Sequence, residues 1–400
     1  MDWIIPPLTL RSHNLARQFP RPSPYPLTLC IILTSQSLAP RSWVRNLSLE
    51  DLEFYVNRTA FELACAHDGP NHFRDTLVNI AILPPCSHLL MALSAFGRHH
   101  RLPRQIPMSG RSSAFEAMTD LQNQLQNGEC NDTHLATALV LKMFAENSGE
   151  VGLTTELESA VNTIICRIRQ RALTASTPFL LRLLLRVLIS AGMVDPPKHI
   201  STTKMVESIF RRQPPSSIFD VDHTLPVRPG VLFLLLRIGT IYHHRCELAK
   251  EHHFPDVANI LLAKRMKKDV DRLVRFSNMP SPTDDSKSKL LACNHAFILA
   301  VQLLMHRTLF PRMNLETFAQ PTVNRILAAV ASVPVGNSAL DSILLWPVFQ
   351  AGLMATSHTA QEFIIRHLSN MHMKGHSRAT ILEQRLHALW EHKGWRLPRC

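Results

Sequence analysis

The stretch Leu340-Asp-Ser-Ile-Leu-Leu-Trp-Pro-Val-Phe-Gln-Ala-Gly352 predicts a helix that is apolar on nearly every face. From Ile343 to Met354 only a proline, a glutamine and a glycine interrupt the apolar residues. In a water-soluble protein such a helix is buried, with other helices packed around it. Pro347 lacks a backbone N–H, so it marks either the first turn of this helix or a kink within it.

Two shorter amphipathic helices are predicted after this one. The first has one apolar face made of Phe363, Ile364, Leu368 and Met371, and it ends at Gly375. Ser377 is a good N-cap for the second. Its apolar residues recur at helical spacing, namely Leu382, Leu386, Leu389 and Trp390, before Gly394. Glycine commonly follows the last turn of a helix, which supports both ends.

This ordered set resembles the C-terminal signature of the fungal-specific transcription factor domain. That family is the helical regulatory half of fungal regulators that bind DNA through a six-cysteine binuclear zinc cluster. The matching residues are Leu344, Leu345, Trp346, Pro347, Ala351, Gly352, Arg366, Leu386 and Trp390. The resemblance implies that seven of them form the core of the family motif: Leu344, Leu345, Trp346, Pro347, Gly352, Leu386 and Trp390.

Two upstream segments extend the resemblance to roughly residues 50 to 395. The first is Glu53-Phe-Tyr-Val-Asn-Arg-Thr-Ala60 with His72-Phe-Arg74 and the stretch Leu89 to Ala95, which is similar to the opening helices of the family. The second runs from Ala117 to Glu146 and corresponds to the helix pair that follows. The chain departs from the family pattern at Glu156-Leu-Glu-Ser-Ala160, which lacks the usual Trp and Gly.

Composition indicates an all-α protein. Of the 400 residues, 46% are hydrophobic and only 13 are glycine, so the chain has material for a large core, and alternating strand patterns are hard to find. Residues 1–48 hold seven prolines, five arginines and one acid without helical periodicity, which predicts a disordered N-terminal arm. We expect one multi-helix domain over residues 49–395.

Proline-rich segments divide the predicted helices. Helices are expected over most of 49–194, with a connection from Asp195 to Pro229 that includes a short helix at 203–212. Further helices are expected at 230–250, 256–276, 290–309 and about 321–333, with an exposed loop at 277–289. The apolar run from Phe179 to Ile189 is broken by two arginines and is too short to span a bilayer, and we predict no transmembrane segment.

The net charge of +12 is spread over helices. Residues 161–212 hold nine Lys or Arg, including Arg182 and Arg186, and we interpret them mainly as solvated helix faces. The densest basic run is made of Lys264, Arg265, Lys267 and Lys268. It is either a nuclear import signal or the polar face of a helix whose apolar side is Ile260, Ala263, Met266, Val270 and Val274.

Cysteine and histidine patterns do not predict a metal site or a cofactor. No two of the eight cysteines are closer than 21 residues, so zinc-ligand spacing is missing and free thiols in a reducing compartment are expected. The histidine pairs at 99–100, 243–244 and 252–253 lack the third and fourth converging ligands that a metal requires.

One motif suggests catalysis. Asp220, Asp222 and Thr224 spell the Asp-x-Asp-x-Thr nucleophile motif of haloacid-dehalogenase-type phosphatases. That chemistry places both carboxylates beside a divalent cation at the end of a buried strand. The preceding segment, Arg211 to Ile218, cannot be that strand, and Asp284-Asp285 lacks a strand as well. We therefore expect no enzyme.

The resemblance implies transcriptional control, nuclear location and protein partners, often as a homodimer or heterodimer. DNA recognition would come from a zinc cluster that this sequence does not contain. Three explanations stay open: a gene model without its first exon, a cluster-less relative that works through partners, or weak DNA binding by the basic helices. A small-molecule effector between the middle helices is also open. The rival hypothesis is a helical scaffold outside transcription.

Overall fold

The computed structural model describes the chain in thirteen segments. These are residues 48–65, 71–82, 86–102, 108–148, 150–191, 200–212, 221, 224–250, 257–277, 286–310, 315–336, 338–373 and 377–391. Every regular element within them is helical, and none is a strand, which confirms the predicted all-α class. Apart from Ser48, the expected N-terminal arm lies outside these segments, so its disorder stays a prediction.

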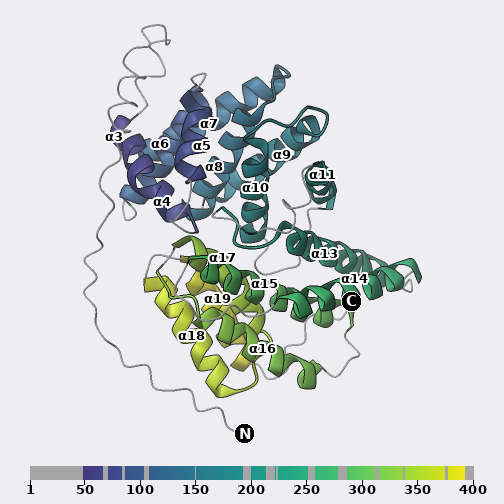
Figure 1. Ribbon diagram of the computed structural model, residues 1–400. Helices are drawn as coiled ribbons and strands as arrows, with labels where there is room; N and C mark the ends of the chain where they lie inside the picture. Colours follow the sequence, from purple (N-terminus) through teal and green to yellow (C-terminus); the bar gives the residue numbers. More distant parts are fainter. Residues whose placement is uncertain are drawn as a thin grey trace, which may run out of the picture. The chain divides into compact units, whose positions relative to one another are not determined.

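The first half of the domain is built around α6 and α8 (Figure 1). Its elements are α3 (Leu49–Phe54), the π-helix η1 (Tyr55–Thr59), α4 (Ala60–Leu63), α5 (His72–Ile82), α6 (Ser87–Arg101), α7 (Met108–Gln126), α8 (Asp132–Ser148), α9 (Val151–Ile168) and α10 (Thr177–Ala191). Helix α6 packs against α3, α7 and α8, and α8 also packs against α9 and α10. Both central helices are buried over most of their length because their apolar residues leave no continuous polar face.

A glycine allows α3 and α6 to approach closely. A Cβ atom on Gly97 would lie 2.1 Å from the carbonyl oxygen of Asp51, so only glycine fits at this crossing. The Asp51 side chain is 1% exposed, and its Oδ1 forms an ion pair with Nη2 of Arg101 at 2.9 Å, which compensates the buried carboxylate. On the following π-helix the buried hydroxyl of Tyr55 donates to the Phe73 carbonyl at 3.1 Å.

The second half of the domain is built around α15. Its helices are α11 (Ile200–Phe210), α13 (Pro229–Lys250), α14 (Val257–Phe276), α15 (Ser286–Leu309), α16 (Leu315–Ala331), α17 (Ser338–Gly352), α18 (His358–Met373) and α19 (Ser377–Glu391). Helix α15 contacts α13, α14, α16 and α17, while α18 packs on α17 and α19. Among the described residues, Lys287–Leu309 is long and apolar enough to cross a membrane, but 83% of its apolar 18-residue window is buried inside the protein. This burial is that of a core helix.

Helix α10 connects the two halves through a buried arginine. It contacts α8 on one side and α13 and α17 on the other. Nη1 of Arg186 donates to the carbonyls of Leu63 (2.7 Å) and Thr224 (3.3 Å), and its guanidinium lies over the Phe73 ring. Arg186 and Arg182 are each only 8% exposed. The interpretation of these two arginines as solvated surface charge was wrong, because a charge count along a helix does not show which face is buried.

The cysteines agree only in part with the expectation of free thiols. Cys65, Cys86, Cys130 and Cys293 are free and buried, and Cys166 is free and exposed. Cys246 is disulfide-bonded, which corrects the expectation at that position. Spacing along the sequence does not reveal a pairing between distant cysteines.

Candidate functional site

The C-terminal signature residues come together where α17, α19 and α15 meet. Nε1 of Trp390 on α19 donates to the carbonyl of Gly352, the last residue of α17, at 3.0 Å. A Cβ atom on Gly352 would lie 2.6 Å from Cδ1 of Leu386, so this glycine lets the two helices approach. Trp346 is 2% exposed and stacks on Phe297 of α15 with ring centroids 4.7 Å apart and an interplanar angle of 22°.

The remaining signature residues fill the interior of the same helix. Leu344 and Leu345 are fully buried. Pro347 lies well inside α17 and not in its first turn, so the helix lacks the backbone hydrogen bond that residue 347 would donate. None of the seven core side chains of the signature is ionisable. The signature can therefore hold helices together, but it offers no group for acid–base or nucleophilic chemistry.

The basic run lies on α14, and three of its four residues are exposed. These are Lys264, Arg265 and Lys268. Nζ of Lys267 instead pairs with Oδ2 of Asp271 at 2.8 Å. The opposite face buries Ala263, Met266 and Val270 as expected, but Ile260 is 39% exposed and does not belong to the core. An import receptor could therefore reach these three exposed residues, and the import role stays a prediction.

The phosphatase-like motif is described only at its last position. Asp220 and Asp222 lie outside the described residues, as do Asp284 and Asp285. Thr224 is 1% exposed, and its carbonyl accepts from Arg186 at 3.3 Å. It therefore takes part in the contact between α10 and the segment before α13, in an all-helical setting.

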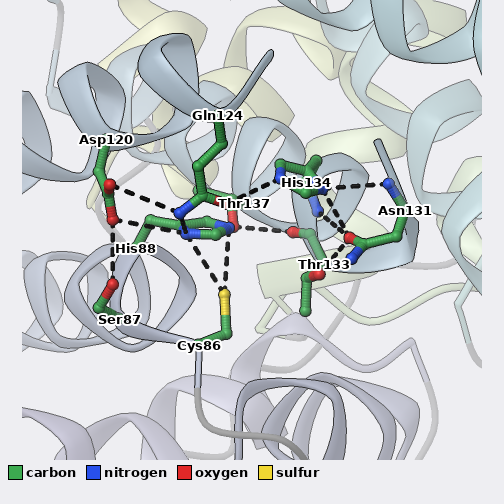
Figure 2. Close-up of polar contacts among 9 residues, drawn as sticks. All are labelled: Cys86, Ser87, His88, Asp120, Gln124, Asn131, Thr133, His134 and Thr137. Carbon is green, nitrogen blue, oxygen red and sulfur yellow. Dashed lines mark hydrogen bonds and ion pairs between the residues drawn. The ribbon is translucent and has the colours of Figure 1, made fainter. Parts of the chain in front are cut away.

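A polar network between α6, α7 and α8 was not predicted from the sequence. Figure 2 shows Gln124 of α7 between two imidazole rings, His88 of α6 and His134 of α8. The Gln124 amide oxygen accepts from Nε2 of His134 at 2.8 Å, and its amide nitrogen donates to Nδ1 of His88 at 3.2 Å. The two rings stack with centroids 5.3 Å apart. One glutamine thus connects both histidines.

Further polar groups complete the network at both ends. Beside His88, Ser87 donates to Oδ2 of Asp120 at 3.0 Å, and Sγ of Cys86 lies 3.0 Å from Nε2 of the imidazole. Beside His134, the backbone N–H of Asn131 donates to Nδ1 at 3.0 Å. All of these residues except Asp120 border a cavity of about 420 Å³. The sequence did contain a signal, since His88 and His134 interrupt otherwise apolar helix faces.

Burial favours the uncharged forms of the histidine and cysteine side chains in this network. Desolvation, with a smaller contribution from His134, lowers the pKa of His88 to about 4. Desolvation also lowers the pKa of His134 and raises the pKa of the Cys86 thiol to about 12. At neutral pH the pair therefore consists of a thiol and a neutral imidazole. A catalytic cysteine needs the opposite, a thiolate beside an imidazolium, so this geometry supports a structural network.

The histidine pairs make separate local contacts. His100 lies 3.3 Å from Oε2 of Glu62, His99 packs edge-on against Phe144, and His243 packs edge-on against Tyr242. The pair at 252–253 lies outside the described residues. Within the segments that the structure describes, no group of three His, Cys, Asp or Glu side chains is arranged to hold a metal ion.

Comparison with known proteins identifies the family. The fungal specific transcription factor domain matches residues 51–395, which includes all of the helices from α4 to α19. Comparisons with curated proteins and with solved structures gave no match. The matched range contains both upstream segments and the C-terminal signature, and the helical architecture agrees with it. The chain belongs to the fungal specific transcription factor domain family.

Proposed function

We propose that this protein is the regulatory half of a zinc-cluster-type fungal transcription regulator and that it acts in the nucleus through protein partners. The observation that carries the proposal is the family match over residues 51–395. Two contacts of the signature residues support it, the stacking of Trp346 on Phe297 and the hydrogen bond from Trp390 to the Gly352 carbonyl. In this account the domain of residues 49–395 responds to partners or to an effector and passes the response to the transcription machinery.

Specific DNA recognition, in this proposal, belongs to a module other than the helical domain. Two arginines of the most basic segment, Arg182 and Arg186, are buried and therefore unable to reach phosphates. Lys267 is already paired with Asp271. The basic segment of residues 161–212 is divided among three helices, α9, α10 and α11, whereas nucleic-acid-binding proteins gather their basic side chains on one face. The contact with DNA would be supplied either by a zinc cluster or by the other subunit of a dimer.

Tethering the full chain to a reporter promoter tests the proposal. The chain is fused to a heterologous DNA-binding domain, and transcription from a promoter with the matching operator is measured. We expect a change of at least 5-fold relative to the DNA-binding domain alone. A fusion that accumulates to the same level and leaves the reporter unchanged would favour the rival function, a scaffold outside transcription.

The basic run on α14 supports the nuclear part of the proposal. Replacing Lys264, Arg265 and Lys268 by glutamine removes three exposed charges, and we expect a fluorescent fusion to shift from nucleus to cytoplasm. The matched control replaces three other exposed basic residues on other helices, Lys204, Arg366 and Arg385. If both triple variants stay nuclear, or both leave the nucleus, the run is not an import signal.

A further inference from the structure

A second cavity lies between α11, α13 and α14. Its volume is about 580 Å³, which falls within the range of small-molecule sites in proteins. The floor is apolar and is formed by Val231, Phe233 and Leu234, which are 1%, 5% and 7% exposed. The cavity therefore has an apolar floor that the hydrocarbon part of a ligand can contact.

The border of this cavity is cationic. Its charged residues are Arg211, Arg228, Arg237, Arg272, Glu207 and Asp269, a net charge of +2. Oε1 of Glu207 is already shared by Nη2 of Arg211, at 2.9 Å, and by Nη2 of Arg237. The Glu207 carboxylate thus pairs with two guanidinium groups. The two acidic residues of the border do not neutralise its four arginines.

Arg228 is the residue that points most directly to a ligand. Its Nε is buried and has no hydrogen-bond partner among the described residues, while the residue as a whole is half-buried. Burial of an unsatisfied donor is unfavourable, so native proteins rarely tolerate it without a reason. The backbone is held in place, since the Arg228 N–H donates to Oδ1 of Asn294 at 3.0 Å and Asn294 is 2% exposed. The unsatisfied guanidinium nitrogen is therefore built into the cavity wall.

The start of α13 adds to the same preference. Gly230 and Val231 of its first turn line the cavity, and this turn contains no acidic residue. The first turn of a helix carries a partial positive charge, which favours an anion. Arginine, the first helical turn and an apolar floor together select a ligand that is anionic at one end and apolar at the other.

We infer that this cavity binds a small amphipathic organic carboxylate. The carboxylate accepts from the Arg228 guanidinium, which presents paired donors matched to two carboxylate oxygens. The apolar body of the ligand lies on Phe233 and Leu234 and removes their exposed edges from water. This binding goes beyond the proposed role in transcription, because it is a property of the purified chain and holds whether or not the chain controls a promoter.

Calorimetric titration of the purified full chain with decanoate and with 1-decanol tests the inference. Both probes carry the same alkyl chain, and only decanoate has a carboxylate. We expect saturable binding of one decanoate per chain at neutral pH, at least 10-fold tighter than that of 1-decanol. Absence of saturable decanoate binding, or equal affinity for the two probes, would overturn the inference.

Three variants locate the binding. Arg228→Met keeps the length of the side chain without its charge and should weaken decanoate at least 10-fold while 1-decanol is unaffected. The control is Arg275→Met, at an exposed residue of α14 outside the cavity, which should bind decanoate like the wild type. Leu273→Trp should fill the cavity and reduce the binding of both probes. Equal decanoate affinity of the Arg228 and Arg275 variants would place the binding elsewhere.

The test stays decisive if a variant folds poorly. Arg228→Met removes a buried donor that has no acceptor, so its melting temperature should equal or exceed that of the wild type. Each variant is therefore melted before titration. If Leu273→Trp unfolds, the Arg228 and Arg275 pair decides. If Arg228→Met unfolds, the comparison of decanoate with 1-decanol on the wild type decides.

Discussion

The indole N–H of Trp390 donates to the Gly352 carbonyl at 3.0 Å, so a side chain of α19 closes the C-terminal end of α17. The last carbonyls of a helix have no partner within it and need one from outside. Here the Ala355 N–H reaches the same oxygen at a longer 3.4 Å. The last tryptophan of the signature and its glycine, 38 residues apart, thus form one contact.

Replacing Trp390 by phenylalanine should remove this hydrogen bond and keep most of the ring packing. We expect the free energy of unfolding to fall by about 0.5–1.5 kcal/mol, the usual net value of one hydrogen bond. Urea denaturation should show a lower midpoint with an unchanged slope, because the surface exposed on unfolding stays the same. An unchanged midpoint would mean that the contact contributes nothing.

Trp346→Ala should destabilise the domain far more. The tryptophan is 2% exposed and stacked on Phe297, so its removal leaves a cavity at the centre of the second half. Large-to-small substitutions of this kind cost about 3–5 kcal/mol, and we expect unfolding or aggregation in thermal melting. Trp346→Phe, which can still stack on Phe297, should retain much of the stability. Wild-type-like melting of the alanine variant would contradict the buried position of α17.

Two glycines should respond to substitution for different reasons. Gly97→Ala forces a Cβ against the Asp51 carbonyl and should cost about 1–3 kcal/mol by overpacking.

Gly128 has φ of +83° with open space around it, so Gly128→Ala should cost about 1–2 kcal/mol through its backbone conformation alone. Asparagine tolerates that conformation. Gly128→Asn should therefore be nearly neutral and Gly97→Asn should unfold, and the reverse order would refute both explanations.

Acid should destabilise the domain through its buried histidines. Burial lowers the pKa of His88, His295 and His367 to about 4 in the folded state, while the unfolded state keeps the ordinary value of about 6.5. Between these values the unfolded chain binds more protons, so stability is full above about pH 6.5 and is lost as the pH falls toward 4. Protonation of each histidine should lower the free energy of unfolding by at most about 3 kcal/mol over this pH range.

Urea denaturation over this pH range measures the effect. His367→Gln should reduce the slope of stability against pH between 6.5 and 4. The matched control is His358→Gln on the same helix, because the His358 side chain is 83% exposed. Equal slopes for the two variants would show that burial of His367 does not govern its protonation.

The helices that could be predicted are those whose apolar residues repeat over several turns. Helix α17 and the apolar face of α18 follow this pattern. Ile364, Leu368 and Met371 are fully buried, while Phe363, predicted for the same face, is half-buried. Boundaries were less predictable. Helix α16 begins at Leu315 and includes Pro321, where the sequence suggested a start; the proline removes one backbone hydrogen bond without ending the helix.

The two cavities could not be predicted, because each is assembled from helices that are distant in sequence. The polar network joins His88, Gln124 and His134 from three helices without a recognisable spacing. The cationic cavity joins Glu207, Arg228 and Leu273 in the same way. The charge pattern also gave a wrong prediction at Arg186. The sequence predicts that this residue lies on a helix, but it does not show which face of the helix is buried. Such sites depend on tertiary packing, which periodicity does not encode.

Promoter occupancy tests the central claim most directly, namely that this helical family member regulates transcription. Chromatin immunoprecipitation of the tagged full chain, expressed at its native level in its own cells, measures where it resides. We expect reproducible enrichment upstream of a limited set of genes, together with only weak, salt-sensitive binding of the purified chain to the same DNA. Occupancy no higher than in an untagged strain, with the protein abundant and folded, would contradict the account.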